Sequence, residues 1–282
     1  MKLLSFIAEG SASYGAVKDR GVVDLGRRLA QRTLRELLEA DRLQDAAAVL
    51  AAGTPDHALD AIAYAPVIPD PGKIICVGLN YRDHVAEVGR TVTEKPALFA
   101  RFATSQVGHL QPVIRPRVSD HFDYEGELAV IIGRRGRHIG RSDALGHVAG
   151  YACYNEGSVR DWQRHTTQFL AGKTFDHTGS FGPWLVTTDE IPDPSRLTLE
   201  TRLNGESVQK TTTDLLITDI PDLIAYCSTI MTLEPGDVIV TGTPGGVGLK
   251  RTPPLFMKPG DTVEVEISGI GLLRNPAAAE GD

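Results

Sequence analysis

The sequence is poor in cysteine and has no long apolar run. Its 282 residues include three cysteines, Cys76, Cys153 and Cys227, and no two of them form a C-x-x-C pair. An odd number of widely spaced cysteines argues against a disulfide framework, so we expect a cytoplasmic protein in a reducing compartment. No segment approaches the roughly 18 apolar residues that a membrane-spanning helix needs, so no membrane partner is expected.

Basic charge and familiar hydrolase motifs are also scarce. The chain has 29 Lys and Arg against 36 Asp and Glu, a net charge of −7. A nucleic-acid-binding protein needs a basic face, so no nucleic-acid partner is expected. A small anionic substrate remains compatible, because a bound metal can invert the local field. The sequence lacks H-E-x-x-H and G-x-S-x-G, which leaves a water nucleophile with a metal as the hydrolytic option.

Strand patterns dominate the chain, and they fall into two unequal parts. Residues 1–68 predict a small α+β domain with short strands and a helix that Thr33 caps and Gly53 ends. Three prolines within residues 66–71 mark a boundary, because proline cannot continue a helix or a central strand. Residues 69–282 predict a catalytic domain of the β-rich α+β class. Strands are expected at residues 73–77, 97–102, 128–132, 148–154, 184–187, 197–203, 237–240 and 262–267, with a hairpin turn at 204–205 and a helix that Asp219 or Thr218 caps.

Two glutamates stand at the head of one strand pattern. Residues 123–133 read D-Y-E-G-E-L-A-V-I-I-G. Residues two apart share a face of a strand, so Glu125 and Glu127 would point the same way. Two adjacent carboxylates repel unless a cation lies between them or one is protonated. The pair therefore favours a site for Mg²⁺, Mn²⁺ or Ca²⁺, and the alternative is a solvated strand end.

Two further segments carry polar side chains next to predicted strand ends. Glu156 would complete a three-acid site, with Arg160 and Gln163 facing the same place from the next helix; the alternative is a helix cap with a solvated face. His84 and Glu87 share one face of a short helix that Asn80 would cap, and such a pair can deprotonate water. The alternative for this pair is an ordinary surface contact.

A lysine and a glycine-rich loop complete the candidate residues. Lys173 lies among small and apolar residues, as either a buried ammonium aimed at an anion or an extended surface chain. The loop over residues 240–248 follows a strand pattern and lacks the G-K-[ST] ending of a phosphate loop, so a nucleotide site is not expected. Its glycines would let backbone N–H groups approach an anionic substrate, and the alternative is a tight turn.

Together these motifs resemble the fumarylacetoacetate hydrolase family. The resemblance covers roughly residues 70–270 and implies a mixed β-sandwich roll for the second domain and a homodimer. The motifs that carry it, in chain order, are G-L-N-Y-R-D-H (78–84), E-G-E-L (125–128), R-D-W-Q (160–163), G-K-T-F-D (172–176) and T-G-T-P-G-G-V-G (241–248).

The resemblance also implies roles for individual residues. It implies Mg²⁺ or Mn²⁺ on Glu125, Glu127 and Glu156, although the family commonly has aspartate where Glu156 stands. His84 and Glu87 match its water-activating pair. Lys173 also matches a residue of the family, and it would stabilise the negative charge that develops on the substrate as pyruvate leaves as an enolate. The matching substrate contacts are Arg160, Gln163 and Thr243.

The implied activity is hydrolysis of a C–C bond in an acylpyruvate, such as maleylpyruvate or fumarylpyruvate, to pyruvate and a carboxylic acid in bacterial aromatic catabolism. Arg82 and Arg101 lie near the motifs and would bind a second carboxylate of such an anionic oxo acid, unless both are surface residues. Two alternatives stay open. One is decarboxylation or tautomerisation of a 2-oxo diacid, such as oxaloacetate, at the same site. The other is a non-catalytic metal protein.

Overall fold

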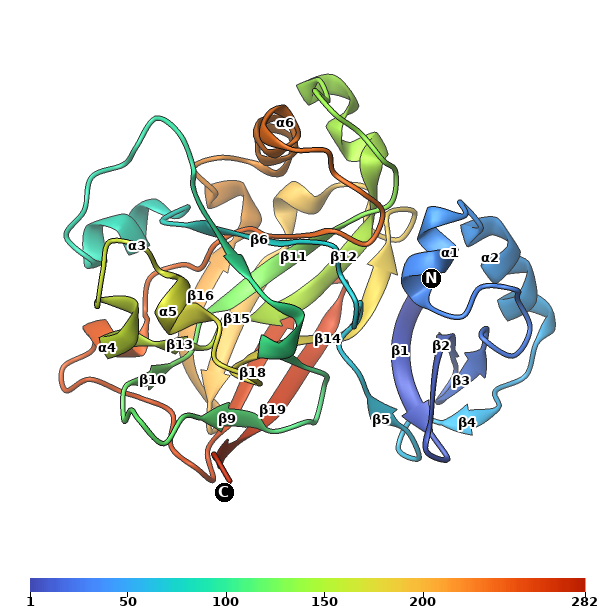
Figure 1. The fold of residues 1–282 in the computed structure, drawn as a ribbon, viewed down its shortest axis with the longest axis horizontal. Coiled ribbons are helices and arrows are strands. Elements are labelled where there is room, and N and C mark those ends of the chain that lie inside the picture. Colours follow the sequence, from blue (N-terminus) through green and yellow to red (C-terminus); the bar gives the residue numbers. More distant parts are fainter. Residues whose placement is uncertain (282) are drawn as a thin grey trace.

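A twelve-stranded mixed sheet forms the frame of residues 1–281, the part of the chain that the computed structural model describes (Figure 1). A five-stranded sheet packs against it, and a two-stranded ribbon lies near the candidate site. This confirms the predicted β-rich α+β class. None of the helices in residues 1–281 is long and apolar enough to span a membrane.

The large sheet runs through both predicted parts of the chain. β1 pairs with β14, so the N-terminal strands continue the sheet of the second part, and the division at residue 68 stays a prediction. In spatial order its strands are β4 (His57–Ala58), β3 (Gly21–Asp24), β2 (Ser11–Lys18), β1 (Lys2–Ala8), β14 (Gly179–Thr187), β12 (Val148–Asn155), β11 (Gly126–Ile132), β17 (Val238–Val240), β6 (Ile74–Gly78) and β7 (Ala97–Arg101), with β5 (Ala63–Tyr64) on β1 and β8 (Gln106–Val107) on β14.

The smaller sheets and the helices surround this frame. The five-stranded sheet has the order β16 (Glu206–Thr212), β15 (Thr198–Leu203), β18 (Thr262–Ile267), β19 (Gly271–Ala279) and β9 (Val113–Arg115), and the ribbon pairs β10 (Phe122–Asp123) with β13 (Ser158–Val159). The helices are α1 (Leu34–Glu39), α2 (Leu43–Ala52), α3 (Arg82–Glu87), α4 (Arg160–Gln163), α5 (Leu170–Lys173) and α6 (Ile220–Ile230). Short 3-10 helices span Ala103–Ser105, Arg141–His147, Pro194–Arg196, Thr213–Leu215 and Gly248–Lys250.

β11 is buried on both faces and divides the core. Leu128 and Val130 belong to the cluster that includes residues of β15, β18 and α6, whereas Ala129 and Ile131 belong to the cluster behind β17, β6 and the N-terminal strands. Because side chains alternate along a strand, Glu125 and Glu127 continue the row of Ala129 and Ile131.

Local signals in the sequence predict several elements well. The Thr33 hydroxyl caps α1 by accepting from the Glu36 amide, and the Asp219 carboxylate caps α6. The 204–205 turn joins β15 to β16 as expected. One difference is the first helix, which divides into α1 and α2 because Asp41 adopts a left-handed backbone conformation with φ of 54°.

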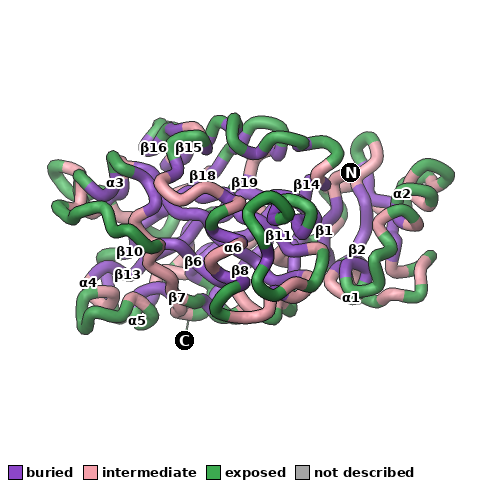
Figure 2. The backbone as a smooth tube through the Cα atoms, turned by 90° about the horizontal axis from the view of Figure 1, so that it is seen from above, coloured by how far each residue is buried: buried purple, intermediate pink, exposed green. Residues whose placement is uncertain are grey.

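The segments that carry the candidate site lie together at one end of the molecule. Figure 1 shows α3, α4 and α5 at the end opposite α1 and α2, and Figure 2 shows the same separation from above, with β6 and β11 buried between them. The site is thus built where buried strands of the large sheet end and exposed connections begin.

Candidate active site

Three glutamates meet where β11 and β12 pair. In this antiparallel pair Gly126 faces Asn155, and the Glu156 amide donates to the Glu125 carbonyl at 2.8 Å. The register therefore brings Glu156 beside the two acids of β11. One carboxylate oxygen from each of Glu125, Glu127 and Glu156 lies within 4.8 Å of the others, and all three side chains are buried.

Gly126 lets the two acids of β11 face the site together. A Cβ at this position would lie 2.0 Å from the Thr201 hydroxyl oxygen on the opposite face of the strand. That distance is far inside normal contact, so any larger residue would push β11 away from β15. The glycine between the two glutamates is thus a packing requirement of the sheet.

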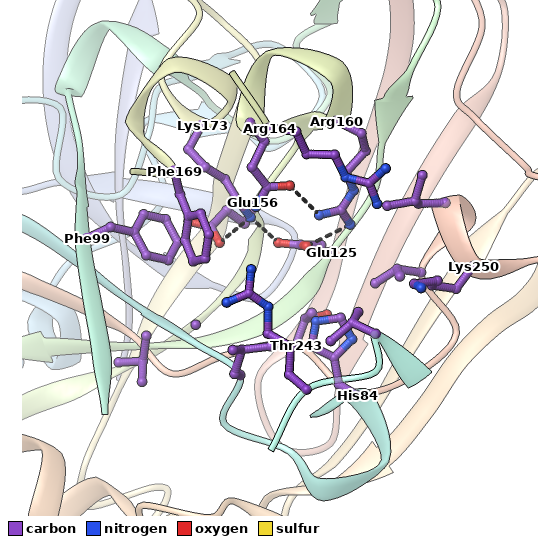
Figure 3. Close-up of a pocket in the computed structure, with 18 of the residues that line it drawn as sticks. His84, Phe99, Glu125, Glu156, Arg160, Arg164, Phe169, Lys173, Thr243 and Lys250 are labelled. Carbon is purple, nitrogen blue, oxygen red and sulfur yellow. Dashed lines mark hydrogen bonds and ion pairs between the residues drawn. The ribbon is translucent and has the colours of Figure 1, made fainter. Parts of the chain in front are cut away.

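Two buried cations contact the acids. The Lys173 ammonium pairs with Glu125 through a short contact and with Glu156 at 2.9 Å, and an Arg160 guanidinium nitrogen lies 2.7 Å from Glu125 (Figure 3). Burial would lower the pKa of Lys173, but the carboxylates of Glu125 and Glu156 outweigh it and raise the pKa, so the ammonium stays charged.

The three acids are not equivalent. Burial would raise the pKa of Glu125, but Arg160 and Lys173 outweigh it and hold the pKa below its usual range. Burial, together with the charges of Glu156 and Glu125, raises the pKa of Glu127 well above its usual range. Glu127 therefore lacks the positive partner that Glu125 has, and a cation between the carboxylates would supply it.

The residues present fit a divalent metal. Glu156 Oε1 is buried without a hydrogen-bond partner in residues 1–281, beside the other two acids. Oxygen donors of this kind suit Mg²⁺, Mn²⁺ or Ca²⁺. The formal charges agree, because this cluster holds four buried carboxylates and only two cations in contact with them, which leaves a deficit of two positive charges. Those residues are Asp123, Glu125, Glu127 and Glu156 against Arg160 and Lys173.

The predicted histidine pair forms on α3 at the edge of the pocket. His84 Nδ1 lies 3.3 Å from Glu87 Oε2, and the Gly246 amide donates to Glu87 Oε1 at 2.9 Å. Burial would raise the pKa of Glu87, but these hydrogen bonds outweigh it and leave the pKa lowered. The prediction that Asn80 caps α3 is wrong: Tyr81 holds that position, and the Asn80 amide instead donates to the carbonyls of Thr218 and Thr241.

The glycine-rich loop lies against the acids. The Gly242 amide donates to Glu127 through a short hydrogen bond. Gly242 has a φ of 107°, a backbone conformation that glycine adopts readily because it has no Cβ. Thr243 lines the pocket, but its hydroxyl already donates to the Gly126 carbonyl at 3.0 Å and accepts from Gln209 at 2.8 Å. In this arrangement the hydroxyl of Thr243 holds the loop on β11.

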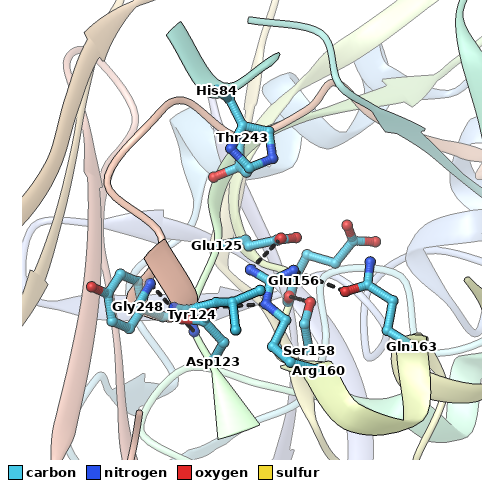
Figure 4. A network of polar contacts seen from close by, with 12 residues as sticks. His84, Asp123, Tyr124, Glu125, Glu156, Ser158, Arg160, Gln163, Thr243 and Gly248 are labelled. Atoms are coloured by element: carbon cyan, nitrogen blue, oxygen red, sulfur yellow. Dashed lines mark hydrogen bonds and ion pairs between the residues drawn. The ribbon is translucent and has the colours of Figure 1, made fainter. Parts of the chain in front are cut away.

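Asp123 is a buried residue that the sequence reasoning did not select. Its carboxylate accepts from Arg160 Nε at 2.8 Å and from the amides of Gly248 and Leu249 at 2.8 and 3.0 Å (Figure 4). Arg160 also donates to Gln163 at 3.1 Å. Asp123 thus fixes both a candidate substrate-binding cation and the end of the glycine-rich loop. Its place two residues before Glu125, in the same motif, was the available signal.

The pocket has a volume of about 390 Å³, and most of the predicted residues line it. Glu87 does not line the pocket, but it is hydrogen-bonded to His84, which does. Predicted residues in the lining are His84, Glu125, Glu127, Glu156, Arg160, Gln163, Lys173 and Thr243.

Two predicted substrate contacts lie outside the pocket. Arg101 is buried, and its guanidinium donates to the Gly157 carbonyl and the Thr178 hydroxyl, each at 2.9 Å. It therefore holds the chain around the site, and it does not line the pocket. Arg82 lies on an exposed position of α3 and does not line the pocket. The structure brings neither arginine to the acids.

The fold and this site define a class of protein: a β-rich α+β chain whose strand ends present three carboxylates, two buried cations and a histidine pair to one pocket. Residues 73–278 match the family model described as fumarylacetoacetate (FAA) hydrolase C-terminal. The chain belongs to the fumarylacetoacetate hydrolase family, as its motifs predicted.

Relatives and solved structures support this assignment along most of the chain. The chain is 43% identical over 248 residues to oxaloacetate tautomerase FAHD2A, mitochondrial, from Homo sapiens, a match that covers 86% of this chain and 79% of the relative. A putative HpcE protein from Mycobacterium smegmatis has a TM-score of 0.90 at 36% identity, with both chains fully covered. Maleylpyruvate hydrolase from Sphingobium sp. SYK-6, solved with manganese(II) and pyruvate, has a TM-score of 0.83 at 29% identity, again with both chains fully covered.

These names cover several reactions. They include a tautomerase and a hydrolase, so membership of the family indicates an enzyme without choosing between the two. The manganese complex and the buried triad of this chain both support a divalent metal.

Proposed function

We propose that this protein interconverts the keto and enol forms of a 2-oxo diacid at a divalent metal, Mg²⁺ or Mn²⁺, held by Glu125, Glu127 and Glu156. The observation that carries the proposal is the triad itself, three buried carboxylates within 4.8 Å facing His84 and Lys173 across one pocket. The 43% identity to an oxaloacetate tautomerase favours this reaction over the others in the family. Oxaloacetate is therefore the first substrate to test.

The chain's own residues divide the work. A divalent cation on the three glutamates would polarise the 2-oxo carbonyl as a Lewis acid. Lys173 and Arg160 bind and orient the carboxylate of the 2-oxo acid end through charge-assisted hydrogen bonds. The Nδ1–H of His84 donates a hydrogen bond to Glu87, which leaves Nε2 unprotonated and able to accept a proton from carbon 3 of the keto form. Return of a proton to the carbonyl oxygen completes the conversion to the enol.

Acylpyruvate hydrolysis is the second candidate, and the His84–Glu87 pair favours it. The same imidazole can take a proton from water, whose oxygen then attacks the distal carbonyl carbon. The bond between carbons 3 and 4 then breaks, its electron pair stays on carbon 3, and carbon 3 takes up the proton that His84 removed from water, which yields pyruvate and a carboxylic acid. Decarboxylation is less favoured, because it requires no water-activating pair and would leave the His84–Glu87 pair without a role.

The test follows the absorbance of enol oxaloacetate with purified protein in Mg²⁺ or Mn²⁺ and again with EDTA. We expect a metal-dependent approach to the keto–enol equilibrium that His84→Ala slows at least ~100-fold, the usual contribution of a positioned acid–base group. Maleylpyruvate and fumarylpyruvate are tested in parallel, with lactate dehydrogenase detecting pyruvate. Pyruvate release without acceleration on oxaloacetate would replace the tautomerase by the hydrolase. A full rate in EDTA or in His84→Ala would overturn both.

A further inference from the structure

One buried side chain of the smaller sheet connects the strand that carries two of the acids to the glycine-rich loop. Gln209 lies on β16, the edge strand of the five-stranded sheet, and is 2% exposed. It does not line the pocket, and the proposed chemistry does not use it. A buried amide needs hydrogen-bond partners for its oxygen and its nitrogen, so the partners of Gln209 show what it holds in place.

The side-chain amide of Gln209 bonds to the strand and to the loop at once. Its Oε1 accepts from the Gly126 amide at 2.9 Å, between the two acids of β11. Its Nε2 donates to the Thr243 hydroxyl at 2.8 Å and to the Pro244 carbonyl at 3.0 Å. These partners fix its orientation, because a backbone N–H needs an acceptor and a carbonyl needs a donor. Gln209 therefore spans β11 and the loop in a single orientation.

The hydrogen bonds of Gln209 close into a ring. The Thr243 hydroxyl, which accepts from Gln209, donates in turn to the Gly126 carbonyl at 3.0 Å. Gly126 thus has its N–H bonded to Gln209 and its carbonyl bonded to Thr243, and all three residues are buried. Buried hydrogen bonds in a connected network strengthen one another, and removal of one partner leaves the others unsatisfied. We use the ring as the name for Gly126, Gln209 and Thr243.

A β-bulge directs Gln209 toward the loop. In the pairing of β15 with β16, Thr201 faces Gln209, whereas the next residue of β15 faces Ser207, so Val208 is an extra residue of β16. Successive residues of a regular strand point to opposite faces, yet Val208 and Gln209 are both buried. A bulge changes the direction of a side chain in this way, and bulges are common next to active sites.

The loop also lies on β16 at its far end. Arg251 donates to the Val208 carbonyl at 2.6 Å, and a Cβ at Gly246 would lie 2.2 Å from the same carbonyl oxygen, so glycine is required for this approach. β16 is therefore the support of the whole loop. The ring holds the end of the loop that contacts an acid, because the Gly242 amide donates to Glu127 there.

We infer that Gln209 is a positioning residue of the metal site, because its amide sets the distance between β11 and the loop whose Gly242 amide binds Glu127. This inference rests on the proposed function, which assigns a divalent metal to the acids. Without the amide of Gln209, the loop would lose its bonds at Thr243 and Pro244, and Glu127 would lose the fixed donor that orients its carboxylate. A metal ligand that loses such an outer partner binds its metal more weakly.

The experiment measures metal binding directly, so it does not depend on turnover. Titration with Mn²⁺, followed by the electron paramagnetic resonance of the free ion, gives the Kd, and turnover of enol oxaloacetate is measured alongside. Gln209→Met keeps the length of the side chain and removes the amide. We expect it to raise the Kd for Mn²⁺ about tenfold and to lower kcat about tenfold.

Asn275→Leu is the matched control. Asn275 lies on β19 of the same sheet, is 1% exposed, and does not line the pocket. Its amide also donates to two backbone carbonyls, those of Gly108 at 2.8 Å and Gln111 at 2.7 Å. Both variants remove a buried amide, so both should lower Tm, but Asn275→Leu should change the Kd and kcat by no more than about twofold.

Variants of Thr243 test the ring. Thr243→Val removes the hydroxyl and should raise the Kd for Mn²⁺, whereas Thr243→Ser keeps the hydroxyl and should keep the Kd. Because either change opens the same ring, Gln209→Met with Thr243→Val should raise the Kd about tenfold and not about a hundredfold. Gln209→Asn, whose side chain is one methylene too short to span β11 and the loop, should also raise the Kd, and it replaces Gln209→Met if that variant does not fold.

The outcomes separate this inference from the proposed function. A native Kd in both Gln209 variants, or an equal rise in Asn275→Leu, would overturn the positioning role. Effects that multiply in the double variant would overturn the ring. A raised Kd in a protein that does not accelerate oxaloacetate tautomerisation would contradict the proposed function and support the role of Gln209. Failure of the native protein to bind Mn²⁺ would overturn both.

Discussion

Replacing Asp123 by asparagine should destabilise the protein although it changes a single atom. The Asp123 carboxylate is fully buried and accepts from Arg160 Nε and from the amides of Gly248 and Leu249. Every group that faces it is a donor. An asparagine would turn an NH₂ toward one of these donors and would remove a counter-charge of the buried guanidinium.

The structure sets the size of this effect. Breaking a buried ion pair by removing one partner costs ~3–5 kcal/mol. Arg160 keeps a second contact, 2.7 Å from Glu125, so the cost of Asp123→Asn should fall at the lower end, about 3 kcal/mol. For a chain of this size each kcal/mol lowers Tm by ~2–4 °C, which predicts a Tm lower by about 10 °C.

Thermal and urea unfolding, followed by circular dichroism, would measure the change. Asp120→Asn is a matched control, because Asp120 is 85% exposed and pairs with Arg115 at the surface. That substitution should change the free energy of unfolding by less than ~1 kcal/mol. If Asp123→Asn lowered it no more than the control does, the buried network around Arg160 would not carry the stability assigned to it.

Three other predictions follow from the same contacts. Glu156→Gln should weaken Mn²⁺ binding at least ~10-fold by titration calorimetry, since it removes a charged ligand, whereas Glu156→Asp should retain binding. Gly248→Ala should lower both Tm and turnover, because its Cβ would lie 1.8 Å from the Leu255 carbonyl oxygen and 2.6 Å from Asp123; an unchanged Tm would refute this. Leu37→Ala in the N-terminal part should cost ~2–5 kcal/mol by urea unfolding and leave KM unchanged, since Leu37 is fully buried far from the pocket.

Features that depend on neighbours in the chain were predictable from the sequence. Strand alternation alone predicts that Glu125 and Glu127 share a face, and helical spacing alone predicts that His84 and Glu87 meet, at 3.3 Å in the structure. The cap at Thr33 rests on the same kind of local rule. Such rules relate residues a few positions apart, where backbone geometry fixes the distance.

Features that depend on long-range register were not predictable in this way. Asn80 looks like a helix cap because it precedes a helical pattern. Its side-chain amide instead donates to the carbonyls of Thr218 and Thr241, far along the chain. Arg101 looks available for substrate because no local pattern reveals its acceptors, the Gly157 carbonyl and the Thr178 hydroxyl. In each case a tertiary partner decides which role the polar side chain takes.

The glycine-rich loop contacts both the His84–Glu87 pair and the Asp123–Arg160 pair, so a change in the loop should affect both pairs. Its Gly246 amide holds Glu87, the partner of His84, while its Gly248 amide holds Asp123, the partner of Arg160. The loop therefore links the proposed base to a cation that orients the substrate. A change that shifts the loop would displace both at once, because interactions with backbone amides cannot adjust independently of one another. Substitutions in this loop should accordingly raise KM and lower kcat together.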